Sequence, residues 1–161
     1  MTKKVLVAYY SMSGNTARIA KTVAQKMGAD LHEIKEVPGT FPSDMFAAND
    51  VFKQQLADGK MPALTSHLDN ADNYDLILIG GPVWDVTVAS PVRTFISSQL
   101  HGFKGQVADF SSAASDTGGY ENDFKELARQ ADLSPISNGL HVNGSRVTNG
   151  QLQKWSQALG L

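Results

Sequence analysis

The stretch that decides the fold is Val5-Leu6-Val7-Ala8-Tyr9-Tyr10-Ser11-Met12-Ser13-Gly14-Asn15-Thr16. Its first half, Val5 to Tyr10, is continuously apolar, as expected for a parallel strand that is covered on both faces. Its second half is polar, and the residues that follow have helical spacing, with apolar side chains at Ile19, Val23 and Met27. A buried strand, a short polar loop and an amphipathic helix in this order predict the first unit of an alternating β/α protein.

The rest of the chain continues this alternation. Further strands are predicted at Leu31–Val37, Leu76–Ile79, Gly105–Phe110 and Leu140–Asn143, and further helices at Ser43–Ala57, Val88–Gln99, Tyr120–Ala131 and Thr148–Leu159. Ser43 is the expected N-cap of its helix, and Gly59 is expected to end it. With right-handed crossovers, these elements predict an α/β fold: a doubly wound five-stranded parallel sheet with helices on both faces. The length of 161 residues predicts a single domain over residues 1–161.

Composition excludes several classes of protein. The chain has 14 Lys and Arg against 16 Asp and Glu, a net charge of −2, so it lacks the basic excess of a nucleic-acid binder. It has no cysteine, which excludes disulfides, thiolate catalysis, cysteine-ligated zinc and iron–sulfur clusters. The apolar runs Val5–Tyr10 and Leu76–Ile79 are too short for a signal peptide or a membrane span. We therefore expect a cytoplasmic protein with no membrane or nucleic-acid partner.

The loop Ser11–Thr16 is the first candidate site, because ligands of open α/β sheets bind at the carboxyl ends of the strands. It offers hydroxyl and amide side chains, a glycine that allows close backbone approach, and the N–H groups of a helix N-terminus, which favour an anion. It lacks the Gly-Lys-Ser/Thr of a Walker loop and the three glycines of a dinucleotide loop. An ordinary capped turn is the alternative. The arrangement favours phosphate binding by neutral donors.

Two further loops are predicted to meet the first at the same edge of the sheet. In the segment 80–87, a Gly80-Gly81-Pro82 turn is expected to end the strand and to place Trp84 at the cleft, where its indole could stack on a planar ring. A tryptophan folded back into the core is the alternative. The segment 111–120 is rich in small residues, so its backbone could reach the edge of a heterocycle, although a simple solvent loop is possible too.

At these residues the chain resembles the flavodoxins. Ser11–Thr16 is similar to their T/S-x-T/S-G-x-T phosphate loop, and the chain is most similar to the members with Gly-x-Pro-x-Trp at 80–84 and Pro-Val-Arg-x-Phe at 91–95. The resemblance implies a flavodoxin-like fold of the short-chain type and non-covalent FMN. It implies phosphate contacts from Ser11, Ser13, Asn15 and Thr16, backbone contacts from Met12 and Gly14, and ring contacts from Pro82, Val83, Trp84, Ser112, Ala113, Ala114, Gly118 and Gly119.

The resemblance also implies a function: transfer of electrons through the flavin to a redox partner protein or a small-molecule acceptor. Two features depart from electron-carrier flavodoxins, which are usually strongly acidic and often carry a stacking tyrosine, for which the only candidate is Tyr120 at the far end of its loop. An NAD(P)H-dependent FMN reductase of quinones and a non-catalytic binding module of the same fold therefore remain as alternatives.

Other proteins with a similar sheet are excluded by missing residues. Receiver domains need an acidic pair after the first strand and an aspartate after the third, where this chain has Ser11 and Gly80-Gly81. Small tyrosine phosphatases need a cysteine. The four histidines show no metal-ligand spacing, so we expect no metal site and assign no catalytic side chain.

Overall fold

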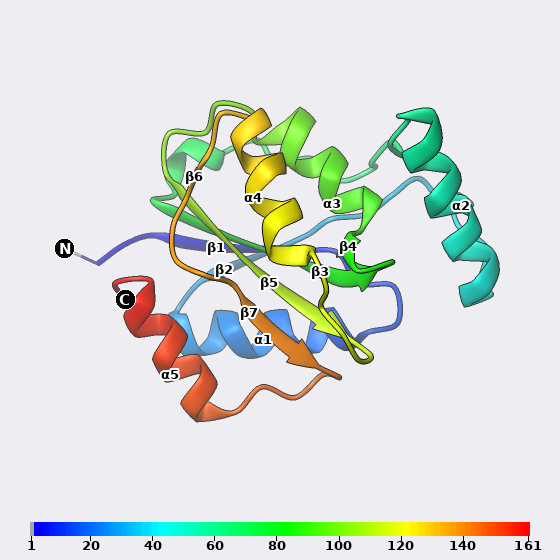
Figure 1. Cartoon of the computed structure of the whole chain (residues 1–161). Helices are drawn as coiled ribbons and strands as arrows, with labels where there is room; N and C mark the ends of the chain where they lie inside the picture. Colours follow the sequence, from blue (N-terminus) through cyan, green and yellow to red (C-terminus); the bar gives the residue numbers. More distant parts are fainter. Residues whose placement is uncertain (1) are drawn as a thin grey trace.

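A parallel sheet with the strand order β2-β1-β3-β5-β6 forms the centre of the molecule (Figure 1). The computed structural model describes residues 2–161. The strands of this path are β1 (Val5–Tyr9), β2 (Asp30–Glu33), β3 (Leu76–Trp84), β5 (Gln106–Ala113) and β6 (Ser134–Pro135). A further strand, β7 (Leu140–Asn143), pairs with the end of β5 just as β6 pairs with its start, so β6 and β7 are two halves of one interrupted edge strand. The predicted five-stranded, doubly wound parallel sheet is confirmed.

Helices cover both faces of the sheet, because the inner strands are apolar on both sides (Figure 1). On one face α1 (Asn15–Met27) and α5 (Asn149–Ala158) pack over Val5, Val7, Leu76 and Leu78. On the other face α3 (Ser90–Thr94), its π-helical continuation η2 (Phe95–Gln99) and α4 (Tyr120–Gln130) pack over Leu6, Ala8, Ile77 and Ile79. The two sets of strand residues alternate in sequence, as the period of a strand requires.

The long connection between β2 and β3 holds α2 (Met45–Asp58) and a short 3₁₀ turn, η1 (Ala71–Asn73). Figure 1 shows α2 at one side of the molecule, beyond α3. Its N-cap is Asp44, whose carboxylate accepts a hydrogen bond from the Ala47 N–H at 2.9 Å, so the expectation of a Ser43 cap was wrong by one residue. Within residues 2–161, no helix has the length and apolar character needed to cross a bilayer.

Several predicted boundaries differ from the structure. β2 ends at Glu33 rather than at Val37, and beyond it only Glu36 forms an antiparallel bridge, to Leu64. The third helix begins at Ser90 rather than at Val88, because Thr87–Val88 form a short strand, β4, that pairs antiparallel with the end of β3.

The Gly80-Gly81 pair does not end its strand, contrary to the prediction. β3 continues through both glycines to Trp84, and its pairing with β5 runs as far as Pro82 opposite Ser112. The glycines are needed for packing instead of for a turn: a Cβ on Gly80 would lie 2.1 Å from the Phe110 ring. The actual turn is at Asp85 and Val86, which both adopt the left-handed conformation, with φ of 50° and 57°.

Candidate functional site

The loop after β1 presents the exposed N-terminus of α1. Gly14 adopts a left-handed conformation with φ of 100°, and no side chain caps the helix. The Gly14 N–H instead donates to Ser11 Oγ at 3.1 Å, while Ser13 and Asn15 are exposed. The positive end of the helix dipole and the N–H groups of its first turn therefore face solvent next to hydroxyl and amide side chains, an arrangement that suits an anion.

Thr16 differs from the rest of this loop because its side chain is buried, with 1% of the residue exposed. Its hydroxyl shares a hydrogen bond of 2.7 Å with the hydroxyl of Ser112, near the end of β5. Thr16 therefore ties the start of α1 to the third predicted loop. Whether its hydroxyl also serves a phosphate stays a prediction.

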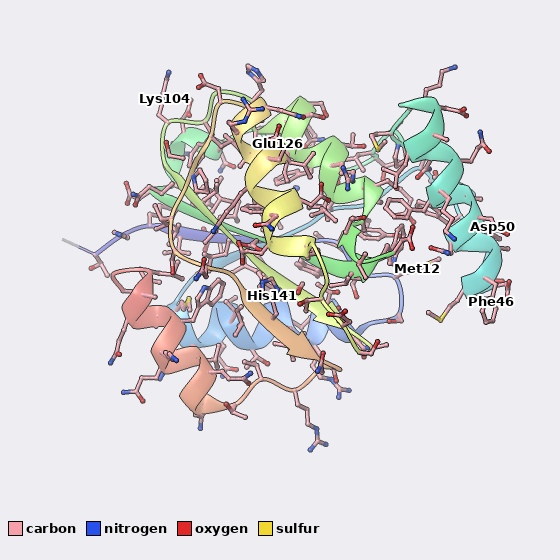
Figure 2. All side chains as sticks on the ribbon, in the orientation of Figure 1. Met12, Phe46, Asp50, Lys104, Glu126 and His141 are labelled. Carbon is pink, nitrogen blue, oxygen red and sulfur yellow. The ribbon has the colours of Figure 1, made fainter. Side chains whose placement is uncertain are left out.

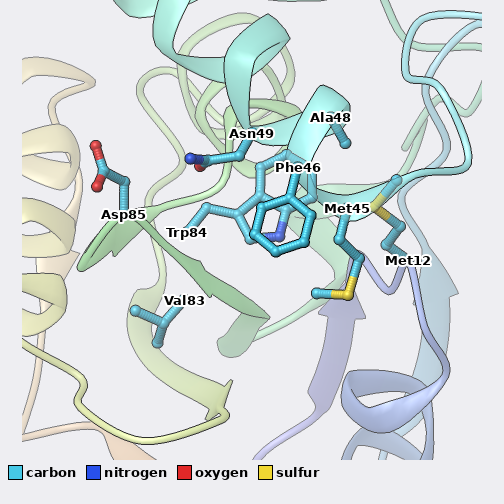
Figure 3. Close-up of a pocket in the computed structure, with 8 residues that line it drawn as sticks. All are labelled: Met12, Met45, Phe46, Ala48, Asn49, Val83, Trp84 and Asp85. Carbon is cyan, nitrogen blue, oxygen red and sulfur yellow. The ribbon is translucent and has the colours of Figure 1, made fainter.

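A cavity of about 340 Å³ opens beside the loop, between the first turns of α2 and the end of β3 (Figure 3). This volume lies near the lower end of the roughly 300–1,000 Å³ that is typical of small-molecule sites. The cavity is lined by Met12, Met45, Phe46, Ala48, Asn49, Val83, Trp84 and Asp85. Met12 belongs to both the loop and the cavity, so an anion and a flat apolar group could be held side by side.

The α2 wall of this cavity was not predicted from the sequence. Met45 and Phe46 are 75% and 85% exposed although both are large and apolar, and they line the same cavity as Trp84 (Figure 3). The available signal was two apolar residues near the start of the predicted helix Ser43–Ala57. Only the packing of α2 beside β3 brings them to the site.

Trp84 is half-buried and combines the two roles that the sequence left open. Its indole makes edge-to-face contacts with Phe41, Phe52 and Tyr10, with ring centroids 5.1, 5.4 and 5.7 Å apart. It therefore packs against the hydrophobic core on the α3 side of the sheet, and it also lines the cavity. A ligand in the cavity would contact an indole that is already fixed by three aromatic neighbours.

The third predicted loop is shorter than expected, because β5 continues to Ala113 through its pairing with β3 and β7. Ser112 and Ala113 are buried, whereas Ala114, Gly118 and Gly119 are exposed. A Cβ on Gly118 would lie 2.3 Å from the Cβ of Val86, so this loop packs directly on the turn after β3. The structure thus brings the three predicted loops together, and the open space lies on the α2 side of Trp84.

An ion pair between α3 and α4 holds the short strand β4, which follows the turn after β3. Asp123 on α4 pairs with Arg93 on α3, and the same carboxylate accepts a hydrogen bond from the Val88 N–H at 3.0 Å. Arg93 Nε donates to the Val88 carbonyl at 2.8 Å. The backbone N–H and the carbonyl of Val88 are therefore both hydrogen-bonded, which holds β4 and the adjoining cavity wall in place.

A cluster of two carboxylates and one histidine near this edge of the sheet was not predicted from the sequence. His141 lies with Asp109 and Glu121, and one ligand atom of each lies within 4.8 Å of the others. The three residues come from β7, β5 and α4, so no short motif could show that they meet.

The fold and the site define an α/β protein with an uncapped helix N-terminus and an adjacent apolar, aromatic cavity at the carboxyl edge of a doubly wound sheet. The chain belongs to the flavodoxin family, whose family model, described as flavodoxin, matches residues 4–159.

Solved structures agree with this assignment. The chain is similar to a flavoprotein from Lactobacillus acidophilus in complex with FMN, with a TM-score of 0.79 and 32% identity over 96% of this chain and 99% of that one. A flavoprotein from Bacteroides eggerthii has the same fold, with a TM-score of 0.80 and 24% identity over 99% of both chains.

Two relatives carry the name NAD(P)H dehydrogenase (quinone). A protein from Rhizobium rhizogenes named NAD(P)H dehydrogenase (quinone) is 35% identical over 91% of this chain and 84% of its own length. A protein of the same name from Geotalea uraniireducens is 30% identical over 74% of this chain, which spans only 62% of that relative.

Proposed function

We propose that this protein is a redox protein that binds FMN without a covalent link and transfers electrons through it. The observation that carries the proposal is the shared position of Met12, which places an anion-binding loop and an apolar cavity in direct contact. A terminal phosphate next to a flat ring system matches this pair of features. A neighbour of 32% identity is a complex with FMN, which supports the same cofactor.

The phosphate would be held by neutral groups. Ser13 and Asn15 offer exposed polar side chains, and Ser11 a half-buried one, around the free N–H groups of α1. We assign further backbone contacts to Met12 and to Gly14, whose N–H donates to Ser11 Oγ in this structure. Hydrogen bonds from such donors to a charged acceptor are worth about 1.5–3 kcal/mol each, so no lysine is needed.

The ring would lie against the ends of β3 and β5 and the loop that follows β5. We assign contacts to Pro82, Val83 and Trp84 on one side, to Ser112, Ala113, Ala114, Gly118 and Gly119 on the other, and to the α2 wall. The flavin supplies the chemistry by accepting and releasing one or two electrons, and the protein binds it, orients it and excludes water from one face. No side chain is assigned an acid or base role.

A second candidate is an NAD(P)H-dependent reductase of quinones or similar flat acceptors. The apolar cavity and the exposed Met45 and Phe46 suit a planar, apolar acceptor, and the near-neutral net charge of −2 departs from the strong acidity of electron-carrier flavodoxins. The names of the relatives favour the same activity.

Two measurements test these proposals. Release of the chromophore by denaturation and its identification by mass should give FMN; FAD as the dominant species, or no flavin affinity, would refute the first proposal. Steady-state oxidation of NADPH with a quinone separates the candidates, since a reductase turns over and a carrier does not. A chain without flavin affinity would be a binding module of the same fold.

A further inference from the structure

A second cluster of polar side chains lies on the α4 side of the sheet, and the proposed flavin site does not use it. Asp109 comes from β5, Glu121 from the first turn of α4, and His141 from β7. Figure 2 shows His141 on the sheet beside the start of α4. Three elements that are separate in sequence therefore direct two carboxylates and an imidazole to one point.

The distances within the cluster are those of a ligand set. His141 Nε2 lies 2.9 Å from Glu121 Oε1 and 3.9 Å from Asp109 Oδ2. A tetrahedral zinc ion with bonds of about 2.0–2.2 Å requires ligand atoms roughly 3.4 Å apart. The two separations from His141 fall on either side of that value, and all three ligand atoms lie within 4.8 Å of one another, so side-chain adjustments without movement of the backbone would bring them onto one ion.

The surrounding groups orient these ligands. His141 Nδ1 lies 2.6 Å from Ser111 Oγ, which leaves Nε2 directed toward the carboxylates. The Gly139 N–H donates to Glu121 Oε1 at 2.6 Å. A Cβ at position 139 would lie 2.5 Å from Asp109 Oδ2, so the glycine is needed for that carboxylate to occupy its place. Hydrogen-bonded outer groups of this kind are typical of metal sites.

Asp109 gives the independent indication of a ligand. The residue is 1% exposed, and its Oδ2, which faces His141, has no hydrogen-bond partner within the described part of the chain. The Oε2 atom of Glu121 is buried and unpartnered as well. A buried carboxylate costs several kcal/mol unless it is paired or coordinates a metal, and two adjacent ones cost more. A cation bound between the two carboxyls, or a proton shared by them, would satisfy this arrangement.

We propose that Asp109, Glu121 and His141 form a binding site for one divalent zinc ion. One nitrogen and two oxygen ligands suit zinc, and three protein ligands leave the fourth position of a tetrahedron for water. The site is independent of the flavin proposal, because none of its ligands is assigned to FMN. A proton shared by the two carboxyls is the competing occupant, and the test separates it from zinc.

The test uses the untagged full-length protein, because a histidine tag would bind zinc itself. After treatment with a chelator and dialysis, titration with Zn²⁺ alone should show one ion per chain by calorimetry and should raise the melting temperature. Titration with Co²⁺ should give the visible absorption of a tetrahedral site with nitrogen and oxygen ligands. Asp109→Asn should weaken Zn²⁺ binding by at least a hundredfold. As a control, Glu126→Gln removes an exposed carboxylate from α4, the helix that carries Glu121, and this variant should bind zinc like the wild type.

A second variant keeps all three ligands in case Asp109→Asn folds poorly. Ser111→Ala removes only the group that orients His141, and it should weaken zinc binding by roughly ten- to a hundredfold. Zinc binding that is absent, or equal in the wild type and both variants, would overturn the proposal. If Asp109→Asn melts above the wild type both without zinc and at every zinc concentration, the site holds a shared proton and the zinc proposal is overturned.

Discussion

Replacing Thr16 by valine tests how the start of α1 is joined to the end of β5. The substitution keeps the shape of the side chain and removes the hydroxyl that lies 2.7 Å from Ser112 Oγ. Both residues are buried, at 1% and 5% exposure, so water cannot replace the lost partner. A buried hydroxyl left without a partner costs about 1–3 kcal/mol, and we expect the free energy of unfolding to fall by that amount.

The pair allows a double-mutant cycle. Ser112→Ala should destabilise the protein by a similar amount, whereas the double variant Thr16→Val/Ser112→Ala should lose little more than either single variant, because no hydroxyl is left unpaired. The expected coupling energy is about 1–2 kcal/mol, measured by urea unfolding of the flavin-free protein at constant m-value. A coupling energy within about 0.5 kcal/mol of zero would show that the two hydroxyls are not paired.

Flavin titration of the same variants separates support of the loop from contact with phosphate. If the Thr16 hydroxyl also serves the phosphate, Thr16→Val should weaken FMN binding roughly ten- to a hundredfold, corresponding to about 1.5–3 kcal/mol. Riboflavin, which has no phosphate, should bind the wild type and this variant equally. Ser112→Ala should weaken FMN binding less. FMN affinity equal to that of the wild type would refute the assignment of Thr16 to the phosphate.

Three further perturbations test Trp84 and Gly118 in the site and the half-buried His32 on β2. Trp84→Ala should destabilise the flavin-free protein by about 3 kcal/mol, because three edge-to-face contacts are lost, and an unchanged unfolding midpoint would contradict this packing. In the wild type, FMN should quench the fluorescence of Trp84. Gly118→Ala adds a Cβ against Val86 at a residue with φ of 52°, so FMN affinity and stability should both fall; unchanged values of both would show that the two loops do not meet. Burial lowers the pKa of His32 below its ordinary value, with His67 adding to the shift, so the folded state binds fewer protons there than the unfolded state. The stability that depends on neutral His32 is therefore present above about pH 6.5 and is lost as the pH falls. In urea unfolding between pH 7.5 and 5, the free energy of unfolding of His32→Phe should fall less than that of the wild type. The exposed His101→Asn control should follow the wild type.

The fold could be predicted from the sequence because its determinants are local. Val5–Tyr10 is apolar throughout, the helix that follows has an apolar stripe, and the same order recurs along the chain, which leaves few possible topologies. The loop Ser11–Thr16 could be placed between β1 and α1 for the same reason, since it is continuous in sequence, and its contact with phosphate stays a prediction. Boundaries were less well predicted: Gly80 and Gly81 suggest a turn by residue type, but their role is to make room for Phe110 and Val92.

The sequence by itself determined the strand–loop–helix units and the polar loop at the first helix, because these depend on neighbours in the chain. Only the tertiary structure decided which distant groups meet. It placed the N-terminus of α2 over Trp84 to form the cavity wall, paired the Thr16 hydroxyl with Ser112, and directed Asp109 and Glu121 to His141. Each of these contacts depends on the register of neighbouring strands and the packing of helices on them. A one-residue shift of register would turn Asp109 or Ser112 to the opposite face of the sheet, and no local pattern records that choice.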